Sequence, residues 1–84
     1  MKTTSKIHGI VFEFSDADVR RAVAVMKSGK NDRVKYYANV DDKHYPLRHL
    51  LVEMLRIKGV TMPDIGPYRA MRILRALGFK ITEE

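Results

Sequence analysis

Residues 33–58 read RVKYYANVDDKHYPLRHLLVEMLRIK, and this stretch decides the fold. Apolar and polar residues alternate over residues 33–40, which predicts a β-strand. A turn at Asp41-Asp42 then leads into a return strand over residues 43–45, so the two strands form a hairpin. Because the turn lacks the glycine that favours primed two-residue turns, we expect a longer or looser loop.

A long amphipathic helix follows the hairpin directly. Pro46 ends the return strand and suits the first position of a helix over residues 46–58. Apolar side chains cover about half of the helix circumference, which predicts the most buried helix of the protein. These side chains are Leu47, Leu50, Leu51, Met54, Leu55 and Ile57.

Downstream, a loop from Gly59 to Gly66 that holds Pro63 and Asp64 separates this helix from the last one. The last helix opens at Pro67 and closes at Gly78, the residue type that commonly ends helices. Its predicted buried stripe is Ala70, Ile73, Leu74 and Leu77. Residues 79–82 alternate and predict a final short strand.

Upstream, residues 7–14 (IHGIVFEF) predict one strand, and a helix follows from the N-cap Ser15. Asp16 and Asp18 lie in its first turn, where acidic groups are favoured by the helix dipole. Gly29 is the predicted end of this helix. Its predicted buried stripe is Val19, Ala22, Val23 and Met26.

The predicted architecture is therefore a single α+β domain over residues 1–84. It combines a small antiparallel or mixed sheet of three to four strands with three helices, in the order β-α-β-β-α-α-β. The chain has no cysteine, so disulfides and cysteine-ligated zinc are excluded. No apolar run reaches the length of a transmembrane helix and no signal peptide is evident, so we expect a cytoplasmic protein without a membrane partner.

The residue pattern does not favour catalysis. Ser5, Ser15 and Ser28 lie in a tail, at a helix cap and at a helix end, so each has a structural role or none. No glycine-rich loop matches a phosphate-binding fingerprint. Asp42, His44 and His49 could converge near the hairpin, but their spacing is that of a polar turn and not of a metal site. We therefore expect no enzyme activity, no metal and no cofactor.

Basic residues carry the functional prediction. The net charge is +6, which favours an anionic partner. On the last helix Arg69, Arg72 and Arg75 lie opposite the buried stripe with Tyr68 beside them, and no acidic residue occurs between Pro67 and Phe79. Such a ridge can contact phosphates across a groove, although an exposed helix face that uses Arg as a helix former is the alternative.

Secondary candidates lie on the hairpin and on the preceding helix. Arg48, Lys43 and Lys35 could extend the same basic surface. One strand face, Lys35-Tyr37-Asn39, could stack bases, although a half-buried strand explains the same residues.

The run YYANVDDKHYPLRHLL and the later RILRALGFKI together cover about half of the chain. They resemble a small module at the N-terminus of modification-dependent HNH restriction nucleases, in which a hairpin ending in Tyr-Pro leads to a helix. The matching residues are Tyr37, Asp41, Tyr45, Pro46, Leu74, Leu77, Gly78 and Phe79. The departures are Asp42 where a turn glycine is usual, Arg48 where a lysine is usual, and Ile65 near where a phenylalanine is usual. The resemblance implies a role close to DNA, but not cleavage, because these residues include no nuclease motif.

Together these observations predict a nucleic-acid-binding domain. The charge pattern fits DNA or RNA, and the resemblance favours DNA. The alternative is a protein-interaction module or homodimer, which the small core and five adaptable methionines would suit.

Overall fold

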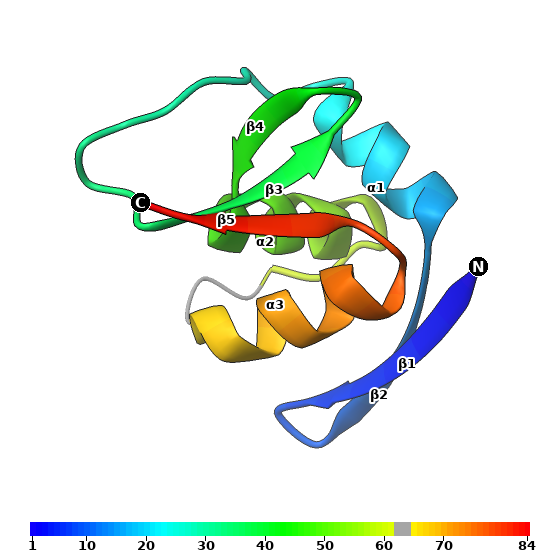
Figure 1. Ribbon diagram of the computed structural model, residues 1–84. Helices are drawn as coiled ribbons and strands as arrows, with labels where there is room; N and C mark the ends of the chain where they lie inside the picture. Colours follow the sequence, from blue (N-terminus) through cyan, green and yellow to red (C-terminus); the bar gives the residue numbers. More distant parts are fainter. Residues whose placement is uncertain (62–64) are drawn as a thin grey trace.

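The computed structural model describes residues 1–61 and 65–84, so Pro63 and Asp64 of the predicted loop lie outside the described residues. The described chain is an α+β fold of three helices and two small antiparallel sheets, one of two strands and one of three (Figure 1). The element order is β-β-α-β-β-α-α-β. The predicted α+β class and three helices are confirmed, but the described chain has five strands in two sheets instead of three to four in one. The additional strand was missed because it is too polar to produce an apolar pattern.

This additional strand belongs to an N-terminal hairpin of β1 (Lys2–Ile7) and β2 (Ile10–Ser15). The two-residue turn at His8-Gly9 has positive φ at both positions, 50° and 82°, as type I′ turns do. The single strand predicted over residues 7–14 is therefore split at this turn. Only Ile7 of β1 is buried, so β1 lacks the apolar alternation by which strands are recognised.

Helix α1 (Asp16–Val23) begins at a reciprocal capping box. The Ser15 hydroxyl accepts a hydrogen bond from the Asp18 N–H, and the Asp18 carboxylate accepts one from the Ser15 N–H at 2.8 Å. The predicted start is confirmed, but the helix ends before Gly29. The Gly29 N–H donates to the His44 carbonyl at 2.8 Å, which ties this segment to the second hairpin.

The second hairpin, β3 (Tyr36–Val40) and β4 (Lys43–Pro46), has the predicted position but a tighter turn. Asp41 and Asp42 have φ of 51° and 64°, so this too is a two-residue turn of the primed kind. The expectation of a looser loop is wrong, because aspartate tolerates the left-handed region that glycine usually occupies.

Helix α2 (Leu47–Ile57) is the most buried helix, as predicted. Pro46 is its N-cap and the last residue of β4, and not its first helical residue. Ile57 was expected on the apolar face, but it is 39% exposed at the helix end. Five side chains of α2 are at most 1% exposed: Leu47, Leu50, Leu51, Met54 and Leu55.

Helix α3 (Pro67–Ala76) buries its predicted stripe. Gly78 (φ 90°), directly after the C-cap Leu77, closes the helix in a Schellman motif, in which the Phe79 N–H donates to the Leu74 carbonyl at 3.0 Å. Strand β5 (Lys80–Glu83) then pairs antiparallel with β3, giving the strand order β4-β3-β5.

The packing of α3 positions the candidate site. Helices α2 and α3 pack against the three-stranded sheet, and α3 also contacts β1 on its other side (Figure 1). Ile7, Phe12 and Phe14 of the first hairpin join the same apolar core as the leucines of α2. The turn of the first hairpin therefore lies beside the exposed face of α3.

Candidate nucleic-acid interface

The exposed face of α3 carries three arginines. Arg69, Arg72 and Arg75 are all exposed, while Ala70, Ile73 and Leu74 between them are buried. Among residues 1–61 and 65–84, no carboxylate lies within 4.0 Å of the three guanidinium groups. The predicted one-sided arrangement of these arginines is confirmed, and their charge is directed to solvent.

A groove of about 800 Å³ separates α3 from the turn of the first hairpin. We call it the basic groove. Its basic lining residues are Lys6, His8, Arg69 and Arg72, and the other lining residues are Ile7, Gly9, Ile65, Gly66 and Tyr68. No acidic side chain of the described chain lines it. Cations from two elements far apart in the sequence thus face one hollow.

The N-terminus of α3 adds to this positive field. Its N-cap is Gly66, so no side chain caps the helix, and its first turn contains no acidic residue. The N-terminal end of a helix carries a partial positive charge. Because Gly66 and Tyr68 line the basic groove, this end of the helix lies at the groove and raises its potential further.

Arg48 supports the groove from α2. Its Nε donates a hydrogen bond to the carbonyl of Ile65 at 2.9 Å. Ile65 is 2% exposed and lines the groove directly before the start of α3. The predicted contact residue Arg48 therefore holds a lining segment in place while its side chain stays exposed.

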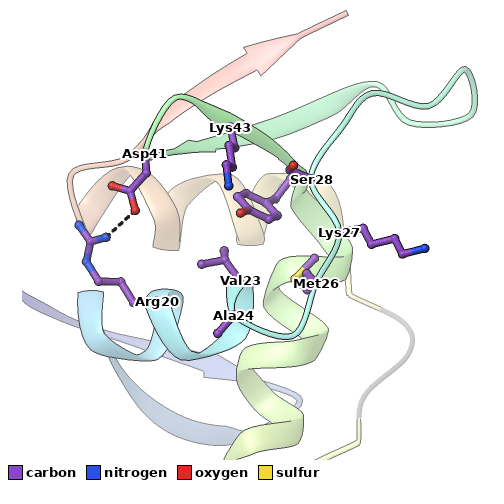
Figure 2. Close-up of a pocket in the computed structure, with 9 residues that line it drawn as sticks. Arg20, Val23, Ala24, Met26, Lys27, Ser28, Asp41 and Lys43 are labelled. Carbon is purple, nitrogen blue, oxygen red and sulfur yellow. Dashed lines mark hydrogen bonds and ion pairs between the residues drawn. The ribbon is translucent and has the colours of Figure 1, made fainter.

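The remaining predicted residues are not in the groove. Arg75 lies one turn beyond Arg72 on the same helix face, outside the lining. Lys43 points into a separate hollow of about 680 Å³ between the second hairpin and α1, where Arg20 is paired with Asp41 at 3.0 Å (Figure 2). Lys35 is paired with Glu83 at 3.4 Å. The structure thus does not join Lys43 and Lys35 to the ridge on α3.

The strand face Lys35-Tyr37-Asn39 cannot stack bases as suggested, because its aromatic ring is not exposed. Tyr37 is fully buried, and its hydroxyl donates to the Asn31 carbonyl at 2.7 Å. Tyr36, on the other face of β3, meets Tyr68 of α3 instead, with ring centroids 6.5 Å apart. This pair forms only when α3 packs on the sheet, so alternation along the strand could not reveal it.

Lys6 and His8 were missed from the sequence. The sequence feature that could have revealed them is the His8-Gly9 dipeptide between Ile7 and Ile10, which fits a two-residue turn. A hairpin with this turn would have placed Lys6 and His8 at its tip. Even so, only the packing of the hairpin against α3 brings them to the arginines.

Within residues 1–61 and 65–84, no three histidine or acidic side chains gather closely enough to hold a metal ion. No helix of the described chain has the length and apolarity needed to cross a bilayer.

Comparison of the chain with protein-family models, curated proteins and solved structures found no match. The resemblance to the module of HNH nucleases therefore stays a prediction from the sequence.

Proposed function

We propose that the chain is a small nucleic-acid-binding domain, with DNA as its ligand and without catalysis of its own. The observation that carries this proposal is the basic groove, in which Lys6, Arg69 and Arg72 face one hollow with no described carboxylate beside them. Arg75 continues the same face along α3. Cations held on two rigid elements can follow a phosphate backbone that runs between them.

The electrostatics favour a polyanion over a single small anion. The cations line a groove of about 800 Å³ and continue beyond it, instead of converging on one point. All of the arginines on α3 are exposed, and their charges are mutually repulsive, so a bound phosphate chain relieves this repulsion and releases counterions.

The test is the salt dependence of DNA affinity. In wild type, fluorescence anisotropy with a labelled 20-base-pair duplex is expected to give a Kd that rises steeply with NaCl concentration. The double substitution Arg69→Ala/Arg72→Ala should reduce the slope of log K against log salt by about 2, because each phosphate contact contributes about 0.9.

A matched control keeps the net charge equal. Arg21→Ala/Arg33→Ala removes two exposed arginines outside the groove and changes the net charge from +6 to +4, as the groove variant does. The control slope should stay close to that of wild type. Equal slopes in all three proteins would contradict the proposal. So would a stable dimer, detected by sedimentation, that buries the groove and does not dissociate when DNA is added.

A further inference from the structure

The basic groove combines positive charge with one exposed aromatic ring. Ile7 and Ile65 belong to its lining, but at 0% and 2% exposed they offer almost no surface to a ligand. The exposed apolar group of the lining is therefore Tyr68. Phosphate contacts need only the cations, whereas an exposed tyrosine ring beside them also favours a flat group such as a nucleobase.

Tyr68 is the group on which such a base could stack. Its side chain is 73% exposed, on the same helix that buries Ala70, Ile73 and Leu74. It lines the groove from α3, and Tyr36 of β3 contacts its ring. Tyr36 thereby limits the positions that the Tyr68 ring can take. An exposed aromatic ring held between a support and a cationic groove is the arrangement that binds unpaired bases.

We propose that the basic groove binds an unpaired nucleotide, with its base on Tyr68 and its phosphates at Arg69, Arg72 and Lys6. This inference rests on the proposed function and narrows its ligand. A base inside a duplex is stacked on both sides and cannot offer a face to Tyr68, whereas an unpaired base can. The volume of about 800 Å³ is in the range of pockets that hold one small molecule, so it suits one nucleotide.

The test compares three ligands in anisotropy titrations: a single strand of oligo(dT), a perfect duplex, and the same duplex with one bulged thymine. The variants are Tyr68→Leu, which keeps an apolar side chain without the ring, and Tyr68→Phe, which restores the ring. Tyr68→Leu should weaken binding to oligo(dT) and to the bulged duplex by roughly 5- to 150-fold, the range for loss of one stacked base. Binding to the perfect duplex should change less than about twofold, because its phosphate contacts remain. Tyr68→Phe should bind like wild type.

An abasic oligomer of the same length separates stacking from phosphate binding. It should bind wild type and Tyr68→Leu equally. The titrations with oligo(dT) and with the bulged duplex identify the source of the unpaired base. If Tyr68→Leu weakens binding to oligo(dT) alone, the ligand is a free single strand. If it also weakens binding to the bulged duplex, the groove accepts an extruded base as well.

Intrinsic fluorescence gives a second readout. The chain has four tyrosines and no tryptophan, and Tyr37 and Tyr45 are buried, so quenching by a stacked base must come from Tyr68 and the half-buried Tyr36 beside it. Saturating oligo(dT) should quench wild type and should quench Tyr68→Leu much less. If Tyr68→Leu weakens no ligand, or weakens all of them equally, the stacking inference is overturned. If Arg69→Ala/Arg72→Ala leaves the salt slope unchanged, the proposed function itself fails.

Discussion

Arg48 and Ile65 are joined by a hydrogen bond of 2.9 Å from the guanidinium Nε to the backbone carbonyl. The bond links the first turn of α2, the most buried helix, to the segment that enters α3. It therefore couples the core to the edge of the basic groove. Arg48 has two possible roles in binding: to hold this edge, or to contact a phosphate itself.

The substitutions Arg48→Ala and Arg48→Lys separate these roles. Loss of the hydrogen bond should lower the free energy of unfolding by about 1 kcal/mol in both variants, because Lys has no donor at the Nε position. If Arg48 acts by holding Ile65, both variants should also lose DNA affinity to a similar degree. Urea unfolding and anisotropy titrations measure the two effects. A Lys variant that keeps full affinity and the wild-type salt slope would show that the positive charge matters more than the hydrogen bond.

Asp18 should make the free energy of unfolding depend on pH in the acidic range. Burial raises the pKa of Asp18, but hydrogen bonds from the Ser15 N–H and the Lys58 ammonium outweigh it, so the pKa lies below the ordinary 3.8. A lowered folded-state pKa stabilises the protein at pH values above 3.8, and this contribution is lost as the pH falls through the folded-state pKa. Wild type should therefore lose stability as the pH is lowered from 5 towards 2.

The substitution Asp18→Asn removes the charge and weakens the cap of α1. It should lower the free energy of unfolding at pH 7 by about 1 to 2 kcal/mol and should reduce the loss of stability on acidification. Urea unfolding at several pH values measures both. Asp32→Asn, in an exposed loop, is the control and should change neither. An acid dependence equal to that of wild type in Asp18→Asn would contradict this assignment.

The second hairpin turn should be improved by glycine at its second position. Asp42 has φ of 64°, a conformation that costs most residues energy and glycine little. Asp42→Gly should therefore raise the free energy of unfolding by up to about 1 kcal/mol. Asp41 is left unchanged because it pairs with Arg20. The opposite change, Gly9→Ala in the first turn (φ 82°), should destabilise the protein by about 1 kcal/mol, and thermal unfolding compares the two. Destabilisation by Asp42→Gly would show that the Asp42 side chain contributes more than the turn geometry costs.

The sequence predicted the parts of the fold whose signal is local. The N-cap at Ser15, the wide apolar face of α2 and the glycine end of α3 are all encoded within a few residues, and the structure contains each of them. Strand β1 has no such local signal and was not predicted. It is held by pairing with β2 and by packing against α3 more than by its own composition.

For the candidate site, helical periodicity alone placed Arg69, Arg72 and Arg75 on one exposed face. Periodicity relates only residues of the same element. It could not show that Lys6 and His8 complete the groove, that Lys35 is paired with Glu83, or that Tyr36 contacts Tyr68 of α3. Those relationships arise from the packing of α3 between the first hairpin and the sheet. The sequence by itself determined which residues α3 exposes, and the tertiary structure decided which other residues lie beside them, because that choice depends on burial of apolar surface between elements distant in the chain.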